Sequence, residues 1–338
     1  MSVEPGGATE EAPSSSSGVL RGFRIALGAV CAVLVLGSIA ARSGSRAWPF
    51  EVFSNLPVQF VILGAFALAV AIALRARTSI VLALVCLALN VGPIISTLRS
   101  DQPPADPTSQ RLRFTSLNAQ NGVINVQALR AHVEEERPDV VVVLDPAPSQ
   151  QLAFRDPPPG YSSYATGGRL RVEIRTPRTT IWSRIPLADV RHPAAVAFGP
   201  SATEFTLRMN GDRVAFLGFG SDSPTTNGRA QERNDILQAA ATWSRMNQDD
   251  GARVIVMGDY NATKWSPVVK LFAHQGRLHN SLDGFGIQPS WPTSNPFLLV
   301  PIDNAYLSDD LVATDRSTGP SFGSLHRSLN VTIAAAAD

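Results

Sequence analysis

An acid and an amide follow directly after an apolar run in the stretch Gly258-Asp259-Tyr260-Asn261, and this pairing is the clearest chemical signal in the chain. The preceding residues, Val254 to Met257, have the composition of a buried strand. Polar groups at the carboxyl end of a strand commonly form a site: Asp259 can hold a hard cation or polarise a water, and Asn261 can donate to a phosphate oxygen. The pair indicates phosphoester chemistry; the alternative is a strand that ends in an ordinary Asx turn.

Four more candidates stand at or near the ends of other predicted strands: Asn118, Asp145, Asp303 and His326. Each of them alone has a plain structural explanation, as a cap or turn residue or, for the histidine, as a surface side chain. If the fold gathers these strand ends, all of the candidates line one pocket, and their oxygen ligands suit Mg²⁺ or Mn²⁺.

Short β-type runs alternate with helical segments from Arg111 onward. The predicted strands are Leu112–Leu117, Val140–Leu144, Arg169–Ile174, Thr179–Trp182, Glu204–Met209, Arg213–Phe219, a strand from Val254, Ile302–Leu307 and Leu329–Ala334. The predicted helices are Val126–Glu136 and about Ala230–Met246. Because strands are in excess and helices are interspersed, the pattern predicts an α/β sandwich of two sheets rather than a regular doubly wound βαβ series.

Three apolar segments without a charged residue fill most of the first hundred residues: Ile25–Ala41, Leu56–Leu74 and Ser79–Ser96. Each is close to the roughly 20 residues that a bilayer-spanning helix needs. Three in series favour transmembrane helices over a cleaved signal peptide or buried core helices. Asn90, in the third segment, is expected to serve helix packing rather than transport. The expected organisation is a disordered tail (1–20), a three-helix transmembrane region (21–99), a linker (100–110) and the α/β domain (111–338).

The arginines around the apolar segments bear on orientation. On one side of the predicted membrane lie Arg21, Arg24, Arg75 and Arg77, and on the other Arg42, Arg46 and Arg99. The very short, doubly basic hairpin at residues 75–77 favours a cytoplasmic amino terminus, so that three spans place the α/β domain outside the cell membrane.

Charge and cysteine content exclude some classes of site. The net charge of +1 argues against a generally basic nucleic-acid-binding surface. The densest basic cluster, Arg169, Arg171, Arg175 and Arg178, faces either an anionic substrate or lipid headgroups, or it is a solvated hairpin. Both cysteines, Cys31 and Cys86, lie in apolar segments, so the α/β domain has no disulfide and no thiolate zinc site.

Six segments, in the expected order, resemble motifs of the endonuclease/exonuclease/phosphatase superfamily, the metal-dependent phosphoesterases related to pancreatic deoxyribonuclease and sphingomyelinase. They are Arg113–Asn118, Arg137–Asp145, Trp182–Pro186, Gly258–Thr263, Ile302-Asp303 and Ser324–Arg327. Trp265-Ser266-Pro267 and Trp291-Pro292, with the three apolar segments, are similar to the membrane-bound branch that includes teicoplanin-resistance proteins, whose domain lies outside the cell. The resemblance implies a deoxyribonuclease I-like sandwich.

The resemblance also implies roles for the candidate residues. Asp259 would orient or deprotonate the attacking water, and Asn261 would bind the phosphoryl oxygen. His326, oriented by Asp303, would stabilise the developing charge or deliver a proton. The Mg²⁺ or Mn²⁺ ligands would be Asn118 and Asp145.

The chain departs from the family motifs at four places. Asp145 stands where the family has Glu, Leu325 replaces an acid, Asn304 replaces a His, and Phe219-Gly220-Ser221 lacks a His that many members carry. The shorter carboxylate leaves the metal deeper, water-bridged or weakly bound.

Two functions stay open. The first is a membrane-anchored, metal-dependent phosphoesterase that hydrolyses a phosphomonoester or phosphodiester. For it, the tether favours a lipid-linked phosphate over long duplex DNA. The second is a catalytically weakened or inactive member that acts as a membrane-tethered binding module. The sequence names neither the substrate, the ion nor the oligomeric state.

Overall fold

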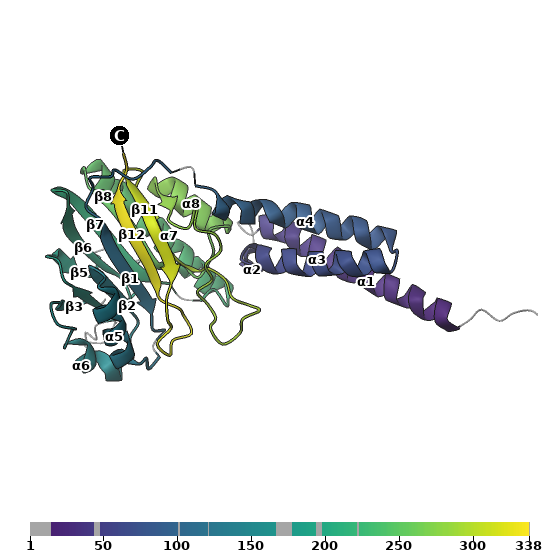
Figure 1. Cartoon of the computed structure of the whole chain (residues 1–338), viewed down its shortest axis with the longest axis horizontal. Helices are drawn as coiled ribbons and strands as arrows, with labels where there is room; N and C mark the ends of the chain where they lie inside the picture. Colours follow the sequence, from purple (N-terminus) through teal and green to yellow (C-terminus); the bar gives the residue numbers. More distant parts are fainter. Residues whose placement is uncertain are drawn as a thin grey trace, which may run out of the picture. The chain divides into compact units, whose positions relative to one another are not determined.

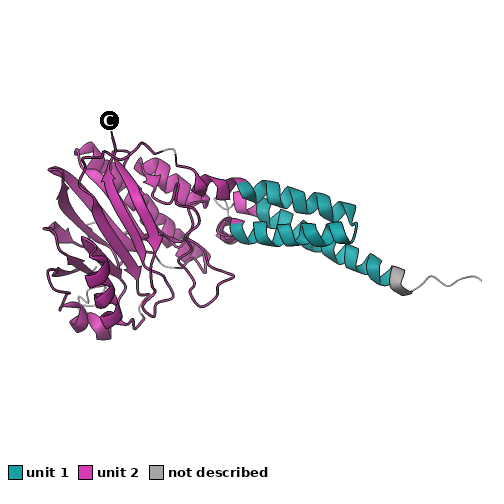
Figure 2. Ribbon diagram, in the orientation of Figure 1, with its two compact units in different colours: residues 1–39, 58–91 teal, residues 40–57, 92–338 magenta. Residues whose placement is uncertain are grey.

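The computed structural model describes residues 15–43, 48–100, 102–120, 122–166, 178–193, 198–221 and 223–337. The chain forms two compact units: unit 1 comprises residues 1–39 and 58–91, and unit 2 comprises residues 40–57 and 92–338 (Figure 2). The expected disordered tail lies outside the described residues up to residue 14, and helix α1 begins at Ser15.

Apolar helices make up unit 1. They are α1 (Ser15–Ala40), α3 (Pro57–Ala73) and the larger part of α4 (Arg77–Leu98). Among the described residues, α1 and α4 are long and apolar enough to cross a membrane; α3 qualifies only if it is joined to the short preceding helix α2 (Trp48–Ser54) as one bent span. Large apolar side chains such as Val33 and Phe66 are exposed on these helices. An apolar surface of this kind suggests association with a membrane.

One buried polar side chain joins two of these helices. Asn90 on α4 donates from Nδ2 to Ser38 Oγ on α1 at 2.7 Å and to the Cys86 carbonyl at 2.8 Å. The hydrogen bond between helices is the packing role that the sequence predicted for Asn90.

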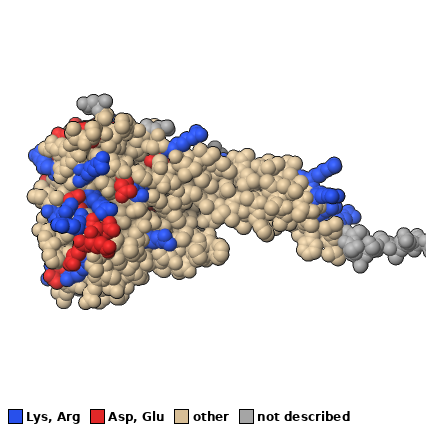
Figure 3. Space-filling model, in the orientation of Figure 1, with Lys and Arg blue, Asp and Glu red and all other residues tan. Residues whose placement is uncertain are grey.

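Arginines gather at one end of unit 1. Arg21 and Arg24, before the apolar part of α1, lie around the same hollow as Arg75 and Arg77 from the α3–α4 turn. The rest of the visible surface of the described unit 1 residues is free of charged side chains (Figure 3). The grouping expected from the sequence, with these four cations on one side, is therefore present.

Two six-stranded sheets form the framework of unit 2 (Figure 1). The strands are β1 (Leu112–Asn118), β2 (Val140–Leu144), β3 (Ser162–Thr166), β4 (Thr179–Ser183), β5 (Ala188–Arg191), β6 (Thr203–Met209), β7 (Asp212–Gly220), β8 (Arg253–Asp259), β9 (His279–Asn280), β10 (Asp303–Leu307), β11 (Leu311–Thr318) and β12 (Leu329–Ala335). The first sheet has the order β11-β12-β1-β2-β4-β3, and the second has the order β5-β6-β7-β8-β10-β9. Each sheet holds one parallel pair, β1 with β2 and β7 with β8, and its other pairs are antiparallel.

Residues that alternate along the strands build the layers. Val140 and Val142 on β2 face the other sheet, whereas Val141 and Val143 pack under α5 (Val126–Glu136). On the second sheet, the outward-facing residues pack against α7 (Asn227–Asp249) and α8 (Pro267–Gly276). The result is two sheets with helices on both outer faces, which confirms the predicted two-sheet α/β sandwich.

The predicted elements agree with the structure except at a few segments. Helix α5 and strand β2 have the predicted bounds. The predicted strand Arg169–Ile174 lies outside the described residues, and β3, which comes earlier in the chain, pairs with β4. Helices α2, α6 (Gln151–Phe154) and α8 and strands β3, β5, β9 and β11 were not predicted.

Candidate active site

The register of the paired strands places the candidate residues at one edge of the two sheets. Asn118, the last residue of β1, pairs with Leu144, so Asp145 follows at the same edge. On the second sheet, Asp259 at the end of β8 pairs with Asp303 at the start of β10. The fold therefore brings strand ends that are far apart in sequence to a common place.

The Asp259 carboxylate is the centre of the site. It is 1% exposed, and its Oδ2 accepts from Asn118 Nδ2 at 2.8 Å and from Asn261 Nδ2 at 2.9 Å. Its Oδ1 accepts the backbone N–H of Asn261 at 2.8 Å. His326 Nε2 lies 3.8 Å from Asp259 Oδ2. A buried carboxylate needs such partners, because an unpaired buried charge is costly.

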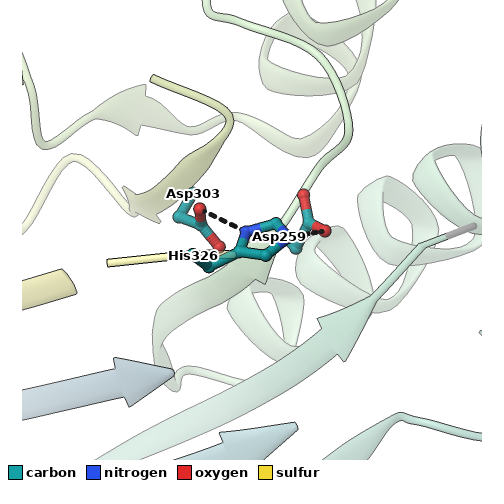
Figure 4. A group of neighbouring side chains, drawn as sticks. All are labelled: Asp259, Asp303 and His326. Atoms are coloured by element: carbon teal, nitrogen blue, oxygen red, sulfur yellow. Dashed lines mark hydrogen bonds and ion pairs between the residues drawn. The ribbon is translucent and has the colours of Figure 1, made fainter. Parts of the chain in front are cut away.

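His326 lies between two carboxylates, as Figure 4 shows. Its Nδ1 is 2.9 Å from Asp303 Oδ2, so the ring donates to Asp303 on one side and faces Asp259 on the other. Ligand atoms of these three residues lie within 4.8 Å of one another. Ser324 fixes the segment that carries the histidine, because its Oγ donates to the Asn118 carbonyl at 2.6 Å and accepts the His326 N–H at 3.0 Å.

Burial and charge shift the pKa values of this group. Burial raises the pKa of Asp259 to about 7, although the cation of His326 opposes that rise. For His326, burial alone lowers the pKa, but the Asp303 and Asp259 carboxylates outweigh it and raise the pKa to about 9. The imidazole is therefore held as a cation at neutral pH, while Asp259 exchanges a proton in that range.

Two backbone features shape the strand end that presents Asp259. Gly258 has a φ of +153°, and a Cβ at this position would lie 2.0 Å from the Phe219 carbonyl oxygen. Only glycine therefore lets β8 approach β7 here. Asn261 follows in the left-handed region at a φ of +46°, which asparagine tolerates better than most residues.

Asp145 lies at the same edge but belongs to a different set of contacts. Its Oδ1 accepts from Arg178 Nε at 2.8 Å and from Ser201 Oγ at 2.5 Å. Its Oδ2 takes no hydrogen bond from another described residue. This oxygen points toward Gly220: a Cβ added to that glycine would lie 3.4 Å from it. Gly220 in turn pairs with Asp259 across β7 and β8. Asp145 is thus near the Asp259 group without being bonded to it.

The donor set fits a hard cation in part. Carboxylate and amide oxygens of Asp145 and Asn118 are ligands that Mg²⁺ and Mn²⁺ accept. The Asn118 Oδ1 atom accepts the Gln120 N–H at 2.8 Å and the Asp145 carboxylate already pairs with a guanidinium, so each residue retains part of its acceptor capacity. The protonated His326 already pairs with Asp303 and faces Asp259, so its positive charge competes with a dication for these carboxylates.

The positions that depart from the family motifs have other contacts. Asn304 is buried, and its Oδ1 accepts from Arg316 Nη2 at 3.1 Å. Leu325 is 44% exposed. Sequence reasoning missed Ser324 as a tether and the contact of Arg178 with Asp145. The signal for Arg178 was its place in the basic cluster; the rest of that cluster lies outside the described residues.

Comparisons with known proteins agree with this fold. The profile of the Endonuclease/Exonuclease/phosphatase family matches residues 115–326. Three solved structures have the same fold. D. rerio TDP2 complexed with single strand DNA product is 15% identical, with a TM-score of 0.52 over 66% of this chain and 99% of that chain. An endonuclease/exonuclease/phosphatase from Beutenbergia cavernae is 16% identical (TM-score 0.51, 67% of this chain and 72% of that chain), and the Bacteroides thetaiotaomicron mannosyl-6-phosphatase is 14% identical (TM-score 0.50, 66% of this chain and 99% of that chain). No curated protein matches the sequence of this chain.

The protonation of His326 can be checked directly. In the full chain in detergent micelles without added metal, we expect the imidazole to titrate near pH 9. In Asp303→Asn, the nearest anion is lost while burial remains, so the pKa should fall to or below the ordinary value of about 6.5. Nitrogen-15 NMR of labelled histidine measures both, with His326→Gln for assignment. An unchanged titration in Asp303→Asn would contradict the assigned ion pair.

Proposed function

We propose that this chain, which belongs to the endonuclease/exonuclease/phosphatase family, is a membrane-anchored phosphoesterase that hydrolyses a phosphomonoester or phosphodiester. One observation carries the proposal. Asn118 and Asn261 both donate to the buried Asp259 carboxylate, and His326 lies between that carboxylate and Asp303. The array combines a base, preorganised donors and a cation, which are the groups that phosphoryl transfer to water requires.

Asp259 is the base in this proposal. With its pKa raised to about 7, it accepts a proton from water more readily than an ordinary carboxylate does at neutral pH. Its hydrogen bonds to Asn118 and Asn261 fix the direction in which the carboxylate faces.

Asn261 and His326 act on the phosphoryl group. Asn261 Nδ2 and His326 Nε2 both point at the same Asp259 oxygen, so a group bound beside this oxygen is within reach of both. In the proposed reaction, the Asn261 amide exchanges its hydrogen bond to Asp259 for one to a phosphoryl oxygen, and the imidazolium stabilises negative charge and supplies a proton to the leaving group. Asp303 holds the ring through Nδ1.

We assign Asn118 and Asp145 as the residues that hold Mg²⁺ or Mn²⁺. The open Asp145 oxygen and the amide oxygen of Asn118 stand at neighbouring strand ends of one parallel pair. When bound, the ion would neutralise phosphate oxygens and lower the pKa of a bound water.

An apolar rim supports a lipid-linked phosphate as the substrate. Phe297 is 85% exposed, and Leu298 and Leu325 are also exposed. Thr293 connects this loop to the site, because it donates from its N–H to the Leu325 carbonyl and from Oγ1 to the Ser324 carbonyl. Farther back in the same loop, the N–H groups of residues 284 and 286 donate to the carbonyl of Thr97, in the last turn of α4. The loop thus runs from the end of a membrane-type helix to the histidine segment.

Nucleic acid is the less favoured substrate, although the related TDP2 structure contains a DNA product. The face of unit 2 seen in Figure 3 mixes acidic and basic side chains. A phosphate-backbone surface is expected to be dominated by cations. A phosphomonoester, as the name of the mannosyl-6-phosphatase indicates for that protein, is compatible with the proposed site.

The second candidate function is a membrane-tethered binding module. The Arg178–Asp145 ion pair favours it, because the guanidinium occupies one oxygen of the assigned metal ligand and adds a like charge near any dication.

The arginine group of unit 1 supports the proposed orientation. Arg21, Arg24, Arg75 and Arg77 stand together at the end where α4 begins. With this end in the cytoplasm, as the positive-inside tendency favours, and three spans, unit 2 lies outside the cell membrane.

The catalytic assignment predicts large losses in two variants. In the full chain with Mn²⁺, Asp259→Asn and His326→Ala should each lower kcat for bis(p-nitrophenyl) phosphate or p-nitrophenyl phosphate by roughly 10²–10⁴-fold, because each removes a proton-transfer group. Release of nitrophenol is the measurement. His274→Ala, at an exposed histidine on α8, is the matched control and should keep the wild-type rate. Wild-type rates in both site variants would exclude the assignment.

Metal binding separates the two candidate functions. Calorimetric titration with Mn²⁺ should show binding to the full chain, weaker binding by about tenfold or more in Asp145→Ala, and tighter binding in Arg178→Gln, where a competing cation is gone. EDTA should abolish hydrolysis. No Mn²⁺ binding, together with no ester hydrolysis by the wild type, would leave the binding module as the function.

The lipid-linked substrate predicts a change in preference. Replacing Phe297 and Leu298 by Ser should lower the ratio of kcat/KM for a polyprenyl phosphate ester in vesicles to kcat/KM for a soluble ester by about tenfold, because contact with the lipid chain is lost. Leu152→Ser, at another exposed leucine outside the rim, is the control. An unchanged ratio would favour a water-soluble substrate.

A further inference from the structure

Helix α2 belongs to unit 2, although its sequence lies between the first two apolar helices. Its Glu51 is buried and pairs with Arg233 on α7, with 2.6 Å between Glu51 Oε2 and Arg233 Nη2. The other oxygen, Oε1, accepts from Ser266 Oγ at 3.0 Å. A carboxylate and a guanidinium that are both buried depend on each other, because an unpaired buried charge is costly.

The guanidinium also reaches the proposed site. Arg233 Nη1 lies 3.4 Å from the carbonyl oxygen of Asn261 and donates to it, and Nε donates to Asn234 Oδ1 at 2.8 Å. Asn261 is the residue whose side chain donates to Asp259. A single ion pair thus connects α2 with the backbone of a site residue.

A second contact from α2 holds the same loop. Asn55, just after the helix, accepts the Thr263 N–H at 2.8 Å and the Thr263 hydroxyl at 3.1 Å through its Oδ1. The loop from Asp259 to Ser266 is therefore fixed to α2 at Thr263 and Ser266, and through Arg233 at Asn261.

We infer that Glu51 and Arg233 are positioning residues of the proposed phosphoesterase, which hold the backbone of Asn261 so that its amide faces the Asp259 carboxylate. Asn261 has a left-handed backbone conformation, so its orientation depends on external contacts. Its carbonyl is fixed by Arg233 on one side, and its amide is fixed by Asp259 and the Ser221 carbonyl on the other. A displacement of about 1 Å in such a group costs roughly 10²-fold in rate.

The inference rests on the proposed function for its kinetic part only. In the full chain, Glu51→Gln should lower kcat for the soluble ester by roughly 10²-fold with little change in KM, because the loss is of alignment rather than of ground-state binding. Hydrogen exchange, followed by mass spectrometry, should become faster in peptides that contain Asn261 and Thr263, whatever the activity.

Glu204→Gln is the matched control. Glu204 is also a buried acid of unit 2 and accepts from Trp243 Nε1 at 2.6 Å and from Arg191 Nε at 2.6 Å, both outside the site. In this variant, kcat and the exchange of the Asn261 and Thr263 peptides should equal those of the wild type.

Glu51→Gln combined with Arg233→Met separates positioning from folding. Removing both buried charges should recover the melting temperature but not kcat, because Arg233→Met removes the donor to the Asn261 carbonyl. If Glu51→Gln does not fold, hydrogen exchange in the double variant tests the inference instead. If a folded variant has the same hydrogen-exchange rates at residues 261 and 263 as the wild type, the inference is overturned. A wild type that hydrolyses no ester overturns the proposed function, and the exchange data then still decide the inference.

Discussion

The structure of the site depends on one constraint, the burial of the Asp259 carboxylate. A carboxylate that is withdrawn from water must meet hydrogen-bond donors or a cation. Here the partners are Asn118 at the end of β1, Asn261 in the loop directly after β8, and His326 before β12. Each partner fixes a strand end or loop of its own. The need to satisfy one oxygen atom therefore aligns both sheets at this edge. The same burial raises the pKa of the acid to about 7, which suits the base role that we propose for Asp259.

The fold was predictable where apolar runs are unbroken or alternate regularly. Val140–Leu144 reads as a central strand because both of its faces are covered, and it was found with those bounds. Strand β11 was missed because its second half carries Asp315 and Arg316 and a register shift interrupts its pairing with β12. Helix α8 was missed although Pro267 at its first position and the buried Val269 and Phe272 are helix signals, because it is only ten residues long.

The site was predictable only as far as strand ends and motif order reveal it. Asp259 and Asn261 are neighbours in sequence, so their association follows from local structure. The partners of buried charges do not. Asp145 pairs with Arg178 across 33 residues and Glu51 with Arg233 across 182, and nothing in the spacing of 29 basic residues singles out either arginine. Such pairs are set by the tertiary fold, which decides which of many possible cations reaches a given acid. For this reason the sequence described Arg178 only as part of a basic cluster.

Glu51 also bears on how many residues of the chain can lie in a bilayer. If α2 were the first part of a bent span with α3, a carboxylate would enter the lipid at a cost of roughly 3 kcal/mol. Its pairing with Arg233 places it in protein, within unit 2, which argues against a bent span that includes α2. With 17 residues, α3 is about 26 Å long, which is close to the thickness of a hydrocarbon core. This matches the apolar segment Leu56–Leu74 and leaves α2 free to hold the loop of Asp259. The segment between α1 and α3, which contains α2, is therefore a part of the α/β unit, although it comes early in the sequence.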